Sequence, residues 1–145
     1  MSEVAKRLNP YLSDLVVMYV KLHDLHWNVK GMQFVPVHQY TESRYDDMAA
    51  KLDEIAELMI MNGETPVSSM KDYLALATVQ ELNKGSYQDR EVLEIVLKDL
   101  TYLKDQAEKL RNTFDAENVF SIVAVLEEHV AGYAKEIWFL RSMLV

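Results

Sequence analysis

The sequence predicts an all-α protein, a four-helix bundle with a short extra helix in the long connection between helices two and three. Apolar residues recur at spacings of three and four over long stretches, as on one face of a helix. Glycine and proline are scarce, at four and three of 145 residues. No stretch shows the alternation typical of strands, and no segment repeats. The length fits one domain, 1–145, that can bury a sizeable core.

The first helix is expected to precede Gly31. Its apolar face comprises Leu12, Leu15, Val16, Tyr19, Leu22, His23 and His26. Two starting points are open. Asn9 could cap the helix with Pro10 at its first position, or the helix could begin near Ser2 with Pro10 in an early turn. Gly31 has the usual C-cap position, so the 29–31 segment should end the helix.

A second helix is expected to begin near Val35 and Pro36 and to run to about Asn62, where Gly63 closes it. A short helix should follow over residues 69–76. The short helix lies between the second long helix and the next long apolar pattern. A long connection, which carries this short helix, therefore separates the second long helix from the third.

The third long helix should open at Ser86 and Asp89, which resemble a capping box. Its apolar face comprises Leu93, Val96, Leu97, Leu100, Leu103, Ala107 and Leu110. The segment 112–118, NTFDAEN, should break it. The face of the fourth helix comprises Val119, Ile122, Val123, Leu126, Val130, Tyr133, Ile137 and Leu140. The long connection in the middle favours a single crossover, as in ferritin-like folds.

Composition excludes several classes of function. There is no cysteine, so disulfides and thiolate metal sites are excluded and any metal must be held by oxygen and nitrogen. The net charge is −8, with 23 acidic against 15 basic residues, which disfavours a simple nucleic-acid binder. No apolar run is long enough to span a bilayer, and the first residues lack a signal-peptide core. We therefore expect a cytoplasmic protein with no membrane partner.

Four residues of the second helix share one face. At about 100° per residue, His38, Glu42, Asp53 and Glu57 lie at roughly 0°, 40°, 60° and 100° around the axis. Along the axis, however, His38 and Asp53 are separated by roughly 22 Å, whereas the two ions of a binuclear site lie about 4 Å apart. One chain cannot close such a site. Two antiparallel helices related by a two-fold axis could, with His26 joining, which predicts two identical sites per dimer.

Two imidazoles with two or three carboxylates suit iron or zinc at an open site. The alternative is that the histidines are ordinary hydrogen-bonded residues and that Asp53 and Glu57 are solvated or paired with Lys51. No histidine is preceded by glutamate at the third position before it, so the Glu-x-x-His motif of usual ferritin-type di-iron bundles is absent. A di-iron centre inside one subunit is therefore not expected.

The segment from Lys21 to Pro66 resembles the Dps family, which is named for DNA protection in starved cells. It combines K-x-H-x-x-H-W, D-E-I-A-E and G-x-x-P motifs at matching spacings. The matching positions are Lys21, His23, His26, Trp27, Gly31, Phe34, His38, Tyr45, Asp53–Glu57 and Gly63–Pro66. The last two helices match only loosely, through Ile137–Trp138.

This resemblance implies a dodecameric, hollow, ferritin-like shell with ferroxidase sites at dimer interfaces. There Fe(II) would be oxidised, often by hydrogen peroxide, and stored as ferric mineral, with up to two iron ions per site and zinc as a substitute. His26, His38 and Glu42 would come from one subunit, with Asp53 as bridging and Glu57 as terminal ligand from its neighbour. The family usually has aspartate at position 42, so the longer Glu42 changes the surroundings of the second metal.

The remaining candidates have lesser predicted roles. His23 is expected to pack or to support the site, and His129 is expected to be structural. Family members that bind DNA commonly use tails rich in lysine and arginine, but Lys6 and Arg7 are the only basic residues before Asn9. We therefore expect no significant DNA binding. The alternatives are a DNA-coating nucleoid protein of the same fold and a structural helical oligomer with a non-functional metal site.

Overall fold

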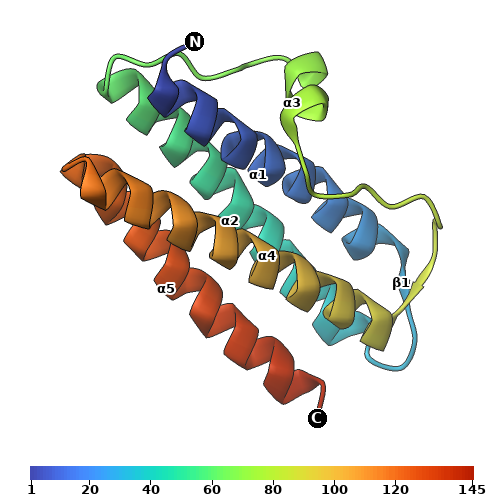
Figure 1. The fold of residues 1–145 in the computed structure, drawn as a ribbon. Coiled ribbons are helices and arrows are strands. Elements are labelled where there is room, and N and C mark those ends of the chain that lie inside the picture. Colours follow the sequence, from blue (N-terminus) through green and yellow to red (C-terminus); the bar gives the residue numbers. More distant parts are fainter.

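A computed structural model covers all 145 residues. Its elements are α1 (Glu3–Asn28), β1 (Val29–Lys30), α2 (Phe34–Met61), α3 (Met70–Leu76), β2 (Tyr87–Gln88), α4 (Asp89–Ala116) and α5 (Phe120–Met143). The four long helices form a bundle, and the connection that carries α3 crosses its length, so α2 and α4 run in the same direction (Figure 1). The predicted bundle with one crossover and a short extra helix is confirmed. None of the helices has an apolar stretch long enough to cross a membrane.

The first helix begins at the earlier of its two expected positions. The Ser2 side chain caps α1 by accepting from the Ala5 N–H at 3.1 Å, and Pro10 lies inside the helix. Asn9 is therefore not an N-cap. Its side-chain amide instead donates to the carbonyl oxygen of Thr65 at 3.3 Å, which ties α1 to the start of the long connection.

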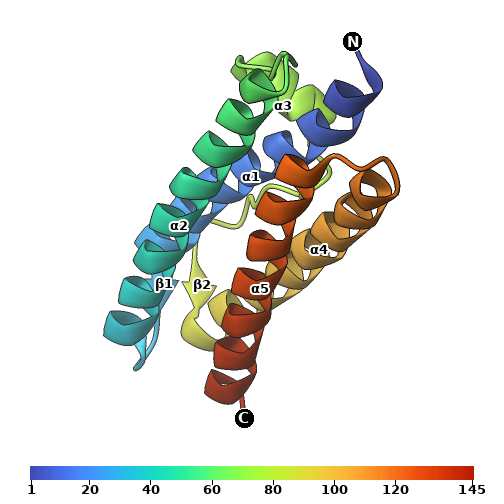
Figure 2. The same ribbon diagram turned by 90° about the vertical axis from the view of Figure 1, so that its left-hand side faces the viewer.

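The end of α1 differs from the prediction by a few residues. The helix ends at Asn28, and Gly31 is not its C-cap, because β1 takes extended backbone and pairs in parallel with β2. Two-residue strands are too short to show alternation in a sequence. They lie side by side near the end of the bundle away from the N-terminus (Figure 2). Gly31 has φ +127°, and a Cβ there would lie 2.5 Å from the Asp89 carboxylate, so this turn requires glycine.

The expected bounds of α2 and α3 are confirmed to within one or two residues. Gly63 has φ +76°, its N–H donates to Ile60 O at 3.0 Å, and the Glu64 N–H donates to Met59 O at 2.9 Å. This is the Schellman arrangement, which satisfies carbonyls that the helix end leaves free. The Ser69 hydroxyl caps α3 by accepting the N–H three residues further on, at 3.2 Å.

The expected capping box at Ser86 is wrong. Asp89 is already the first residue of α4, and its N-cap, Gln88, makes no side-chain cap. The Asp89 carboxylate instead accepts from the Gln33 N–H at 2.9 Å, because β1–β2 pairing brings the turn before α2 against the start of α4. A break between the last two helices is confirmed, with Asn118 at φ +61°, but its expected start at residue 112 is wrong, because α4 continues to Ala116.

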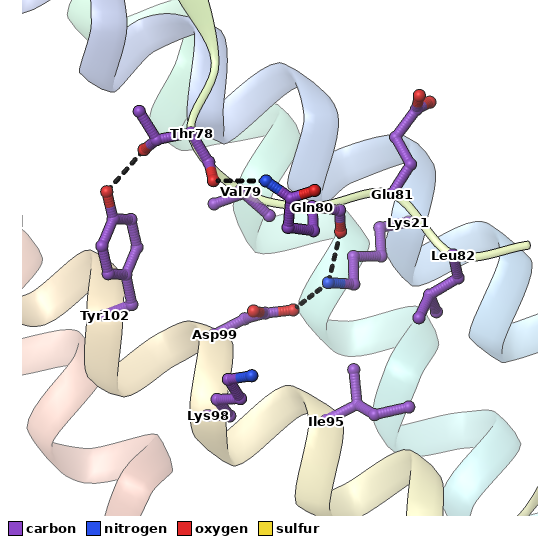
Figure 3. Close-up of a pocket in the computed structure, with 10 residues that line it drawn as sticks. All are labelled: Lys21, Thr78, Val79, Gln80, Glu81, Leu82, Ile95, Lys98, Asp99 and Tyr102. Carbon is purple, nitrogen blue, oxygen red and sulfur yellow. Dashed lines mark hydrogen bonds and ion pairs between the residues drawn. The ribbon is translucent and has the colours of Figure 1, made fainter.

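Buried polar side chains of α1 hold the long connection. The Asp14 carboxylate accepts from the Thr78 N–H at 2.5 Å and from the Thr78 hydroxyl at 2.7 Å. Further along, Lys21 Nζ donates to Gln80 O at 2.6 Å and lies 2.6 Å from Asp99 Oδ2 on α4, beside a cavity of about 290 Å³ (Figure 3). Burial raises the pKa of Asp99 despite the neighbouring Lys21 ammonium. The connection is thus fixed to two helices.

The apolar core draws on all four long helices. The faces predicted for α1, α4 and α5 supply about half of it, and α2, for which no apolar face was predicted, adds Val37, Met48, Ile55, Leu58 and Met59. On the predicted face of α4, Leu97 and Leu110 are half-buried. The buried positions of that face are Leu93, Val96, Leu100, Leu103 and Ala107. Burial of this kind contributes about 25 cal/mol per Å² of apolar surface, which makes packing rather than helix propensity the main support of the bundle.

Candidate metal site

Two histidine side chains lie against each other where α1 ends and α2 begins. The rings of His26 and His38 are stacked, with centroids 3.6 Å apart and planes at 13°. His26 Nδ1 donates to the carbonyl oxygen of His38 at 2.6 Å, and His38 Nδ1 donates to the carbonyl oxygen of His26 at 2.7 Å. Each ring is therefore held by the backbone of the other residue.

This reciprocal arrangement selects the ring nitrogen that can bind a metal. A carbonyl oxygen only accepts hydrogen bonds, so Nδ1 carries the hydrogen in both rings and Nε2 keeps the lone pair of a neutral imidazole. Neither Nε2 has a hydrogen-bond partner within the chain. Metal-binding histidines usually donate their other ring N–H to a carbonyl or carboxylate, which is the pattern seen here.

The local sequence explains why the pair forms. The last carbonyls of a helix have no partner within it, so the His26 carbonyl at the end of α1 is free to accept from His38. The intervening turn, residues 29–33, is held by the Asp89 carboxylate. The Thr41 hydroxyl lies 3.2 Å from His26 Nδ1 and 3.0 Å from the carbonyl oxygens of both Val37 and His38, to one of which it donates. Thr41 was not predicted, because its only signal in the sequence is its place one turn after His38.

The three candidate carboxylates, unlike the two histidines, are not held in place by the rest of the chain. Glu42, Asp53 and Glu57 are exposed, and none forms an ion pair within the chain. The nearest contact of Glu42 is a long hydrogen bond of 3.4 Å from the Tyr45 hydroxyl. The alternative that Lys51 pairs with Asp53 or Glu57 is wrong, because its ammonium lies 2.5 Å from Asp47 instead.

The chain brings His26 and His38 together but leaves Asp53 and Glu57 apart from them. α2 is one unbroken helix of 28 residues, so the rise of about 1.5 Å per residue keeps its two ends separate. No group of three or more histidine, aspartate or glutamate side chains within the chain could hold a metal ion. The helix is thus continuous, as the argument for a site shared between two chains requires.

An aromatic cluster borders the histidine pair. The Tyr45 ring stacks on His23 with centroids 3.8 Å apart and meets His26 edge-on at 5.2 Å. His23 Nδ1 donates to the Tyr19 carbonyl at 2.8 Å, and Trp27, on the other side, is 69 % exposed. His23 therefore packs beside the pair rather than facing it, and its supporting role stays a prediction.

A second polar group, inside the bundle, was not predicted from the sequence. His129 is buried, yet its partners are not the adjacent glutamates of α5. Its Nε2 lies 2.7 Å from Glu54 Oε1 on α2, and its Nδ1 lies 2.8 Å from the Tyr11 hydroxyl on α1. Burial lowers the pKa of His129, and the Glu54 carboxylate opposes that shift. The expectation that His129 is structural did not foresee a network that joins three helices.

Comparisons with known proteins agree with this architecture. Residues 5–145 match the family model of the ferritin-like domain. The chain is 31 % identical to a DNA protection during starvation protein of Helicobacter pylori, over 98 % of this chain and 96 % of the relative. It is 35 % identical to DNA protection during starvation protein 2 of Bacillus anthracis, over 98 % and 97 %.

A solved structure extends the match to three dimensions. The Dps protein of Bacillus brevis superposes with a TM-score of 0.93 at 30 % identity, covering 98 % of this chain and 95 % of that one. The match therefore includes α4 and α5, where the sequence motifs were weak. The chain belongs to the Dps family of ferritin-like proteins.

Proposed function

We propose that the protein is a ferroxidase and iron store. It oxidises Fe(II) at two identical sites per dimer, each built from His26, His38 and Glu42 of one subunit and Asp53 and Glu57 of its neighbour. The reciprocal His26–His38 pair carries this proposal, because it presents two imidazole Nε2 lone pairs without a protein partner. Imidazoles with carboxylates form a donor set that suits iron, with zinc as a competitor.

The assembly follows from the two halves of α2. Antiparallel packing of two α2 helices about a two-fold axis places the histidine end of one beside the carboxylate end of the other. Large apolar side chains flank the histidine end and are exposed in the single chain. These are Trp27, Met32, Phe34 and Val35. Exposed apolar groups of this kind mark subunit contacts, and six such dimers would complete the proposed dodecameric shell.

The residues of the site have distinct tasks in the oxidation. The imidazoles bind Fe(II) through Nε2, because Nδ1 of each ring is held by a backbone carbonyl. The carboxylates then balance the charge that rises when Fe(II) becomes Fe(III). Two ferrous ions supply one electron each to hydrogen peroxide, which takes up two protons and leaves as two waters. This stoichiometry consumes both reagents that would otherwise generate hydroxyl radicals.

Protection of DNA, which the relatives' names describe, would then act through iron and peroxide rather than by coating. A subunit charge of −8 repels phosphate, and a shell of such subunits multiplies the effect. A mobility-shift assay with duplex DNA at moderate ionic strength tests this. A retarded complex would instead favour the DNA-coating alternative.

The deciding experiment is an anaerobic Fe(II) titration followed by a peroxide pulse, with ferric absorbance as the readout. Wild type is compared with His38→Ala, Asp53→Ala and a mixture of the two variants dissociated and reassembled. We expect rapid oxidation in wild type, its loss in each variant, and partial recovery in the mixture, because some mixed dimers contain one intact site. Absence of stoichiometric iron binding by wild type would leave a structural oligomer as the better account.

A further inference from the structure

A hydrogen-bonded chain of titratable groups crosses the bundle interior, apart from the candidate metal site. The hydroxyls of Tyr11 and Tyr133 lie 2.7 Å apart, and the Tyr11 hydroxyl lies 2.8 Å from His129 Nδ1. On its far side, His129 Nε2 lies 2.7 Å from Glu54 Oε1. Both tyrosines are at most 2 % exposed, whereas the Glu54 side chain is 43 % exposed. The chain therefore leads from the core to the surface.

The hydrogen bonds of this chain have one consistent direction. The Glu54 carboxylate accepts, so His129 Nε2 carries a hydrogen and Nδ1 is free to accept from the Tyr11 hydroxyl. The Tyr11 oxygen in turn accepts from Tyr133. Burial lowers the pKa of His129 and raises the pKa values of both tyrosines, which keeps the imidazole neutral and the phenols protonated near pH 7. The Tyr11 hydroxyl thus faces the unprotonated Nδ1 of His129, which can accept its proton.

The hydrogen-bond partners distinguish the two phenols. The Lys51 ammonium lies 5.3 Å from the centroid of the Tyr133 ring, but it is paired with Asp47 at 2.5 Å, so its charge does not separate the two rings. Tyr133 lacks a base, since its hydroxyl is bonded to another phenol. Tyr11 has a base, because His129 can take its proton and Glu54 stabilises the imidazolium that results. Tyr11 is therefore the phenol that loses an electron more readily.

We propose that Tyr11 and His129 form a one-electron relay that intercepts hydroxyl radicals. Tyr11 gives an electron to the radical, which becomes hydroxide and takes up a proton from solvent to form water. At the same time the phenol proton moves to His129 Nδ1. The tyrosyl radical is then reduced by one Fe(II), which becomes Fe(III), and the proton returns from His129. The net reaction converts one hydroxyl radical, one Fe(II) and one proton into water and Fe(III).

Location supports this role. His129 joins the relay to α2 at Glu54, the residue after the candidate ligand Asp53, so the relay ends on the helix turn that would bear the iron. The buried pair is also shielded from other protein molecules, which prevents two tyrosyl radicals from coupling. Iron as the source of radicals rests on the proposed function, whereas the relay chemistry of Tyr11 does not.

The test supplies the oxidant without iron. Metal-free protein is exposed to azide radicals produced by radiolysis of an azide buffer, frozen after a delay, and studied by electron paramagnetic resonance. We expect a persistent tyrosyl radical in wild type and its loss in Tyr11→Phe. Tyr87→Phe is the matched control, because Tyr87 is equally buried but its hydroxyl accepts from the backbone N–H groups of Lys84 and Gly85 and has no histidine.

A second measurement needs no substitution in the core. In wild type exchanged into D₂O, electron–nuclear double resonance should detect two deuterons hydrogen-bonded to the radical oxygen, one from the Tyr133 hydroxyl and one from His129. An undiminished persistent radical in folded Tyr11→Phe, or a wild-type radical with only one such deuteron, would overturn the relay. Since no iron is present, these outcomes are independent of whether the ferroxidase proposal holds.

Discussion

His38, near the start of α2, and Asp53, about four turns further along the same helix, are prepared very differently for a ligand. The His38 ring is stacked on His26 and bonded to its carbonyl before any metal arrives. The Asp53 carboxylate is exposed, without an ion pair. One half of the candidate site is thus organised by the chain itself, and the other half is left for a neighbouring chain to organise.

This difference teaches where each kind of ligand finds its support. An imidazole has a second nitrogen, so backbone carbonyls can fix its orientation while the first nitrogen stays free. The second oxygen of a carboxylate could be held in the same way, but Asp53 is exposed and has no ion pair within the chain, so its orientation is left to whatever packs against it. We therefore expect substitutions in the two halves to have similar effects on iron oxidation but different effects on stability.

The largest expected effect compares the halves directly. Asp53→Ala should abolish rapid Fe(II) oxidation and leave the free energy of unfolding nearly unchanged. His38→Ala should abolish oxidation too, but lower the free energy of unfolding by about 1–3 kcal/mol, because the His26 carbonyl loses its partner. Ferric absorbance and denaturant unfolding measure the two quantities. Asp46→Ala, an exposed acid on the same helix, is the control that should change neither.

Thr41→Val sharpens the comparison within the histidine half. The substitution keeps the shape but removes the hydroxyl beside His26 Nδ1, so Fe(II) affinity should fall by roughly 10- to 100-fold, the usual effect of losing a group that orients a ligand. Isothermal titration without oxygen measures the affinity. Thr101→Val on α4 removes an analogous hydroxyl-to-carbonyl bond far from the site. Equal losses in both variants would contradict a specific role for Thr41.

A pH titration of stability tests the buried network as a third region. Burial lowers the pKa of His129 below its usual 6.5, so its neutral form stabilises the fold above that value. As pH falls below 6.5 toward the folded pKa, the free energy of unfolding should decrease by at most about 1.4 kcal/mol per pH unit. His129→Gln should flatten this slope, while His23→Gln, at a half-exposed position, should retain it. An unchanged slope in His129→Gln would assign the pH dependence to other groups.

The smallest expected effect is that of Glu42→Asp, which restores the residue usual in the family. Glu42 is exposed and makes only a long contact with Tyr45, so stability should not change. Binding of the first iron by the imidazoles should also stay the same, with less than about a tenfold change for the second iron. Stoichiometric titration resolves the two steps. A large loss of the first binding step would show that Glu42 does more than complete the second position.

Sequence periodicity predicted the helices because packing repeats every three or four residues, and Gly63 marked the end of α2 because it takes positive φ. The capping box at Ser86 and the C-cap at Gly31 were wrong for a common reason. Both ends are shaped by the pairing of β1 with β2 and by the contact of Asp89 with the turn before α2. Such contacts join residues more than fifty positions apart and leave no local pattern.

By itself the sequence determined the all-α class, the crossover and the separation of His38 from Asp53, since each follows from spacing along one chain. The family followed from the resemblance of the motifs between Lys21 and Pro66. Only the tertiary structure decided that both His26 and His38 present Nε2, because their Nδ1 hydrogen bonds depend on how α1 and α2 pack. It also decided that His129 meets Tyr11 and Glu54 rather than its neighbours in sequence. Hydrogen bonds between helices depend on distance in space, which spacing along the chain does not encode.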